Sequence, residues 1–147
     1  MLDIREKNGK LIHLDLEPEP DGFLENTEEV ISYYQEWLIP SAIRALHKKR
    51  GLTEEQAKVA VYTHLQLCYD VCHFALAYEK PAEAFARLKA AGIKIGKIQL
   101  SAALKTSLPE DVETRGEICE TLASLAESTY LHQVVERSND GQLTQYP

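Results

Sequence analysis

The sequence is poor in cysteine and has no long apolar stretch. Cysteine occurs only three times in 147 residues, at Cys68, Cys72 and Cys119, and an odd, sparse set is typical of reduced thiols rather than of a disulfide framework. No apolar run reaches the about 18 residues that a membrane-spanning helix needs. The opening stretch MLDIREKNGK is charged and lacks the apolar core of a signal peptide. These features predict a cytoplasmic protein without a membrane span.

Basic residues are also scarce. The chain has 16 Lys and Arg against 23 Asp and Glu, which gives a formal net charge of -7. Because nucleic-acid surfaces need clustered Lys and Arg, we expect no nucleic-acid partner. The one basic cluster, residues 47–50, falls where a helix is expected to end, and cations there complement the helix dipole. With 44% hydrophobic and 27% charged residues, the composition predicts a folded protein, and the length predicts a single domain over residues 1–147.

Hydrophobic periodicity predicts alternating strands and helices. Period-2 or short apolar runs predict strands at 11–17, 65–70, 93–101 and 129–137, and longer patterns with caps predict helices at 26–51, 53–65, 80–92 and 108–128. Pro40 is expected to kink or divide the first helix. Strands that alternate with helices are joined as parallel strands by right-handed crossovers.

The expected strands have one polar face. In the first two strands this face carries His13, Asp15, Glu17, Gln66, Cys68 and Asp70. A parallel sheet covered by helices on both sides is apolar on both faces, so a polar face favours the wall of a (β/α) barrel with a wet mouth. His132, on the fourth expected strand, is interpreted as a hydrogen-bonding residue of the barrel interior.

A closed barrel of this type has eight strands and about 250 residues. The predicted fold is therefore α/β, a partial TIM barrel of about four βα units with parallel strands, in which the tail 138–147 is unfinished or flexible. The competing fold is a self-standing open α/β sheet. A half-barrel also has exposed strand edges, which favours self-association or pairing with the missing half.

Polar side chains stand at the end of each expected strand. Glu17, Asp70, Gln99 and Glu136 occupy these positions, and the carboxyl ends of barrel strands meet at one site. Carboxylate and amide oxygens suit Mn²⁺ or Mg²⁺ better than Zn²⁺. His73 follows Asp70 by three residues and is placed to contact a ligand hydroxyl or a metal. Cys68 and Cys72 lack zinc-finger spacing, so we interpret both as packing residues.

The stretch LCYDVCHFA resembles the C-x-D-T-C-H signature of the xylose-isomerase-like TIM barrels, the superfamily of sugar phosphate isomerases and epimerases. DLEPEPDGFLENTEEV is similar to that superfamily's strand with a terminal glutamate ligand, and YLHQVVER takes the place of its last strand. LEPEP, AGIKIGKIQLSAAL and ESTYLHQVVER look closer to the EboE proteins, a family linked to metabolite traffic in bacterial secondary-metabolite clusters. The resemblance implies that the chain is a C-terminal portion of such a barrel.

Carried over by position, the resemblance makes Glu17 and Glu136 metal ligands and the acid/base pair, Asp70 a further ligand, and His73 a substrate-binding residue. Gln99 stands where a metal-binding histidine is expected, which disfavours zinc. The implied activity is divalent-metal-dependent proton transfer on a sugar-like small-molecule metabolite, with Mn or Mg as the ion. The alternative is a non-catalytic protein that binds or carries a metabolite. The presence of Gln99 in place of the expected metal-binding histidine favours this alternative.

Overall fold

The computed structural model describes residues 1–126 and 133–146. The chain divides into two compact units, Met1–Ala102 and Ala103–Pro147. Within the described ranges, every helix is too short or too polar to cross a lipid bilayer. Residues 129–132 of the fourth expected strand, His132 among them, lie outside the described residues.

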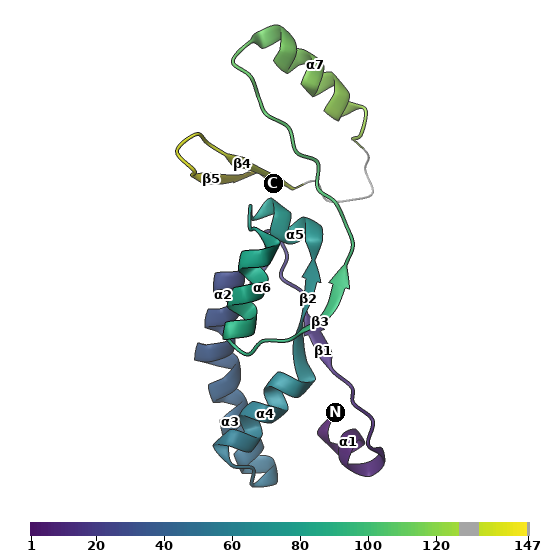
Figure 1. Ribbon diagram of the computed structural model, residues 1–147, viewed down its shortest axis with the longest axis vertical. Coiled ribbons are helices and arrows are strands. Elements are labelled where there is room, and N and C mark those ends of the chain that lie inside the picture. The colour runs from purple at the N-terminus through teal and green to yellow at the C-terminus, as the bar shows by residue number, and fades with distance from the viewer. Residues whose placement is uncertain (127–132, 147) are drawn as a thin grey trace. The chain divides into compact units, whose positions relative to one another are not determined.

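A three-stranded parallel sheet forms the centre of the first unit (Figure 1). Its strands are β1 (Leu14–Leu16), β2 (Leu65–Asp70) and β3 (Ile95–Gln99), in the order β1-β2-β3. Leu16 pairs with Leu67, and Asp70 pairs with Gln99. The prediction of an α/β fold with parallel strands is confirmed for this unit.

The first unit contains seven helical segments. They are α1 (Leu2–Asn8), α2 (Thr27–Ser32), the π-helix η1 (Tyr33–Leu38), α3 (Ile39–Arg50), α4 (Glu54–His64), α5 (Val71–Leu76) and α6 (Pro81–Ala90). The change from π-helix to α-helix falls next to Pro40, whose ring nitrogen cannot donate a helical hydrogen bond. Thr53 and Gln56 form the expected capping box at the start of α4. Neither α1 nor α5 was predicted from the sequence.

The two faces of the sheet differ in character. Leu67 and Tyr69 of β2 are buried against the helical layer that contains Val30, Phe74 and Leu88, and Figure 1 shows α2 and α6 on the same side of the strands. On the opposite face β2 presents Gln66, Cys68 and Asp70, because side chains alternate along a strand. The helices thus cover the apolar face and leave the polar face as the candidate site.

The second unit contains α7 (Val112–Ala123) and a hairpin of β4 (Val134–Arg137) and β5 (Leu143–Tyr146). β4 pairs antiparallel with β5, so the prediction of a fourth parallel strand is wrong for the described residues of 129–137. The reason is the turn between them, in which Gly141 has φ 89° and its N–H donates to the Ser138 carbonyl at 3.0 Å. Strand β5 lies in the tail 138–147, which was expected to be unfinished or flexible.

Candidate functional site

The ends of three parallel strands bring Glu17, Asp70 and Gln99 into contact. The Gln99 side-chain amide nitrogen, Nε2, donates to Glu17 Oε1 at 2.7 Å and to Asp70 Oδ2 at 2.6 Å. Glu17 follows β1 directly, Asp70 ends β2 and Gln99 ends β3. Because Asp70 and Gln99 are paired in the register of the sheet, their side chains lie on the same face. Of the four residues predicted to converge, these three do so.

Asp70 is the most deeply buried member of this cluster, with 5% of its surface exposed. Its Oδ1 accepts a hydrogen bond from the Cys72 backbone N–H at 3.0 Å, which caps α5, and another from the Ser101 hydroxyl. Burial opposes ionisation of Asp70, but hydrogen bonds from Ser101, Cys72 and Gln99 outweigh it and hold the pKa of this carboxyl well below its usual range. Asp70 is therefore ionised at neutral pH.

The orientation of the Gln99 amide follows from its neighbours. Its Oε1 accepts a hydrogen bond from the Lys97 ammonium, and an ammonium group can only donate. On the other side the ionised carboxylates can only accept. The amide therefore presents its NH₂ group, and not its oxygen, to Glu17 and Asp70.

His73 lies in the first turn of α5 and faces the segment that follows β1. Its Nδ1 is 2.8 Å from the Pro18 carbonyl oxygen and 3.8 Å from Glu17 Oε1. Because a carbonyl oxygen only accepts, Nδ1 carries the proton in the neutral ring, and the lone pair is on Nε2. A histidine held in this way is prepared to accept a hydrogen bond from a ligand or to coordinate a metal through Nε2.

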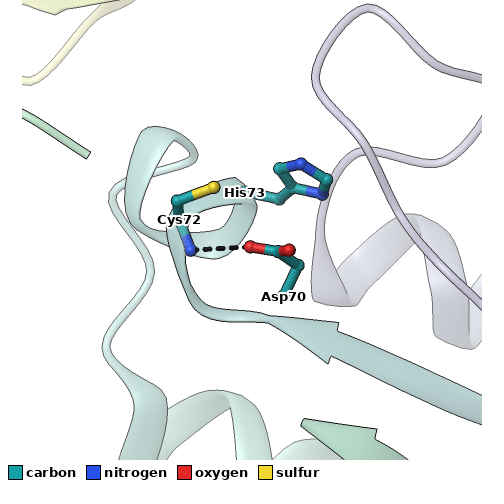
Figure 2. A group of neighbouring side chains, drawn as sticks. All are labelled: Asp70, Cys72 and His73. Atoms are coloured by element: carbon teal, nitrogen blue, oxygen red, sulfur yellow. Dashed lines mark hydrogen bonds between the residues drawn. The ribbon is translucent and has the colours of Figure 1, made fainter. Parts of the chain in front are cut away.

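A second combination of residues overlaps this cluster. One candidate ligand atom each from Asp70, Cys72 and His73 lies within 4.8 Å of the others, and Figure 2 shows the three side chains around the start of α5. Burial raises the pKa of the Cys72 thiol, so without a metal this thiol stays protonated. Carboxylate, sulfur and imidazole together favour a metal such as zinc over Mg²⁺. Cys72, interpreted from the sequence as a packing residue, is therefore also a candidate ligand.

Glu136 lies on β4 in the second unit. There its Oε2 accepts a hydrogen bond from the Tyr146 hydroxyl at 2.8 Å. The pairing of Glu136 with Glu17 as ligands and as acid and base therefore stays a prediction.

The expected Mn²⁺ or Mg²⁺ ion fits the observed arrangement of Glu17, Asp70 and Gln99 poorly. Such an ion needs oxygen lone pairs directed at one point. Here the Gln99 NH₂ group already donates to both carboxylates, and the amide oxygen is directed to Lys97. As arranged, the three side chains satisfy each other's hydrogen bonds without an ion.

Two residues of the cluster, Lys97 and Ser101, were not identified from the sequence. Both could have been found from the sequence, because Lys97, Gln99 and Ser101 occupy every second position along β3 and its extension and so share the face of Asp70.

Cys68, predicted to be a packing residue, is 1% exposed. Burial, with a further effect from the charge of Glu17, raises the pKa of its thiol to about 11.

Comparisons of the chain with models of protein families, with curated proteins and with solved structures find no match.

Proposed function

We propose that this chain is part of a TIM barrel of the xylose-isomerase-like type, similar to the EboE proteins, and that its strand-end cluster binds a sugar-like metabolite. The parallel strands, the helices on one face and the polar groups on the other support this fold. The resemblance of LCYDVCHFA and LEPEP to the superfamily supports the site. Within the cluster, the carboxylates of Glu17 and Asp70 are acceptors for ligand hydroxyl groups, and Gln99 is a donor.

One observation favours binding over metal-dependent catalysis, namely the amide of Gln99 between two carboxylates. Its Nε2 is 2.7 Å from Glu17 Oε1 and 2.6 Å from Asp70 Oδ2, so it occupies the place between the two carboxylates where a divalent ion would bridge them. Hydroxyl groups of a sugar-like molecule can replace these hydrogen bonds one for one, at little cost in free energy. A metabolite-binding role, such as one in metabolite traffic, therefore agrees best with the geometry.

The second candidate function is a divalent-metal-dependent isomerase or epimerase. The group formed by Asp70, Cys72 and His73 favours it, because these residues offer three ligand atoms within 4.8 Å of one another. A bound divalent ion would supply polarisation of neighbouring substrate oxygens. Glu17, with 37% of its side chain exposed, would be the group of this unit that moves a proton, and Glu136 would be its proposed counterpart.

The test is a titration of the ¹⁵N-labelled chain with pentoses, hexoses and their phosphates, followed by NMR. We expect one class of sugar to cause saturable shifts at residues 17, 70, 73 and 99. Glu17→Gln, which keeps the shape but removes an acceptor charge, should weaken binding about tenfold, and Glu117→Gln on the exposed side of α7 is the matched control. If no sugar produces saturable shifts, or if Glu17→Gln binds like the parent chain, the proposed function is wrong.

The same samples separate binding from catalysis. Each sugar that binds is incubated with the parent chain and either Zn²⁺ or Mn²⁺, and the products are separated by chromatography, with EDTA as the control. A metabolite-binding protein returns the sugar unchanged. A product that forms only with the metal and is lost in Glu17→Gln would favour the second candidate.

A further inference from the structure

The cluster contains an amide whose orientation is set by its neighbours on both sides. Gln99 lies between two groups that only accept hydrogen bonds, Glu17 and Asp70, and one group that only donates, the ammonium of Lys97. Lys97 and Gln99 are two residues apart on β3, so their side chains project from the same face of the strand. If the amide turned over, its NH₂ would face an ammonium and its oxygen would face two carboxylates. Both contacts would be repulsive.

The orientation of the Gln99 amide determines which ions the cluster can bind. The NH₂ group of Gln99 uses one oxygen of each carboxylate, and the other oxygen of Asp70 accepts from Ser101 and from the Cys72 N–H. A divalent cation would have to displace these donors and approach the ammonium of Lys97. With the amide turned over, the same three side chains would instead direct three oxygens at one point, the ligand type that Mn²⁺ and Mg²⁺ prefer.

We propose that Lys97 is a positioning residue that holds the Gln99 amide with its NH₂ toward Glu17 and Asp70, and so makes the site between these two carboxylates select against Mn²⁺ and Mg²⁺. The inference rests on the proposed function only for the location of the site, because its test measures cation affinity and needs no metabolite. Selectivity of this kind prevents Mg²⁺ in solution from competing with ligand hydroxyl groups for the two carboxylates. It also explains chemically why glutamine can stand where a metal ligand is expected.

Binding of Mn²⁺ to the full chain, measured by electron paramagnetic resonance at pH 7, tests the proposal. Gln99→Glu replaces the NH₂ donor by an oxygen of the same size, and Lys97→Met removes the ammonium while it keeps the apolar stem. We expect Gln99→Glu to bind Mn²⁺ about 30-fold more tightly than the parent chain, and Lys97→Met about 3-fold more tightly. The matched controls are Gln35→Glu and Lys94→Met, which make the same charge changes at exposed positions and should stay within about twofold because distant charges are screened.

Two further measurements separate positioning from a general structural effect. The side-chain NH₂ resonances of Gln99 should move toward the values of a free glutamine in Lys97→Met. They should keep their parent positions in Lys97→Arg, which retains a donor. Circular dichroism establishes that each variant is folded. If Gln99→Glu does not fold, the comparison of Lys97→Met with Lys97→Arg tests the proposal.

Two results would overturn the proposal. A Lys97→Met variant with parent Mn²⁺ affinity and parent Gln99 resonances would remove the role of Lys97. Gln99→Glu with the affinity of the parent chain would show that the amide does not exclude cations. A failed sugar titration together with a gain of Mn²⁺ binding in Gln99→Glu would leave this inference standing and remove only the proposed function.

Discussion

The hydrogen bonds of Asp70 make one substitution especially informative. Asp70→Asn keeps the size of the side chain and retains one oxygen, which can still accept from the Cys72 N–H and from Ser101. The new NH₂ group takes the place of Oδ2, which now accepts from Gln99 Nε2 at 2.6 Å. Two donors would then face each other in a place where the parent residue is 5% exposed. The substitution therefore exchanges a charged hydrogen bond for a repulsive contact.

The size of the effect follows from the bonds that are lost. A hydrogen bond to a charged group contributes about 1.5–3 kcal/mol, and a buried donor left without a partner costs about 1–3 kcal/mol. Gln99 keeps its bond to Glu17, so only part of the second cost applies. We expect Asp70→Asn to lower the free energy of unfolding by about 2–4 kcal/mol, within the range of these two contributions.

Urea unfolding followed by circular dichroism measures this loss. With a slope of about 2 kcal/mol per molar urea, a usual value for a small protein, the midpoint should fall by about 1–2 M. Ser101→Ala, which removes one donor from Asp70 Oδ1 and keeps the charge, should lose less, and Glu36→Gln at an exposed position of η1 should keep the parent midpoint. An Asp70→Asn midpoint equal to that of the parent chain would refute the argument that these hydrogen bonds hold the strand ends together.

The difference in free energy of unfolding between the parent chain and Asp70→Asn should depend on pH in a definite direction. The pKa of Asp70 is lower in the folded chain than in the unfolded chain, because hydrogen bonds from Ser101, Cys72 and Gln99 outweigh the effect of burial. Its contribution to stability is therefore fully present above the unfolded value of about 3.9 and is lost as the pH falls toward the folded value. The gap between parent and Asp70→Asn should be constant from pH 5 to 8 and should narrow below about pH 4. A gap that narrows as the pH rises would contradict this assignment.

Three other outcomes can be checked on purified protein. Gly96→Ala should destabilise the first unit by about 1–2 kcal/mol, because the new Cβ would lie 2.1 Å from Asp15 Oδ1 and would force this carboxylate away from His13 Nδ1; an unchanged urea midpoint would contradict this. Gly116→Ala, in an open position on α7, should instead raise the helical signal and stabilise that helix by about 0.5–1 kcal/mol, and a lower signal would contradict it. Iodoacetamide at pH 8 should label exposed Cys119 quickly and Cys68 only on unfolding, because Cys68 is buried and its pKa is raised to about 11; mass spectrometry that finds both labelled at equal rates would refute it.

The parallel sheet was predictable from the sequence, and the hairpin was not recognised. The order of strand and helix patterns, with Pro18 after the first strand and the capping box at Thr53, is local information that the structure confirms. For the last strand, the stretch SNDGQ after Arg137 carries Asn, Asp and Gly, which are typical of tight turns, and it closes β4 onto β5. A strand followed by such a turn pairs antiparallel with the next segment, and β4 therefore pairs with β5.

The membership of the site was partly predictable, but its hydrogen bonding was not. Glu17, Asp70 and Gln99 are strand-end residues, and parallel strands bring such residues together. Which atom of Gln99 faces the carboxylates depends on Lys97 and on the pairing of β2 with β3, which are contacts between distant parts of the chain. Helix α5 was missed although its signal is local: the predicted strand ends at Asp70, and the Asp70 side chain then caps a helix of only six residues, Val71–Leu76.

The most direct measurement concerns the two side-chain amide protons of Gln99 in the parent chain, observed by NMR. If the ends of β1, β2 and β3 meet as described, these protons should exchange slowly with water and show contacts to protons of residues 17 and 70. Both the slow exchange and these contacts should be lost in Asp70→Ala. Rapidly exchanging protons without those contacts in the folded parent chain would contradict the convergence of the three strand ends, on which the proposed site depends.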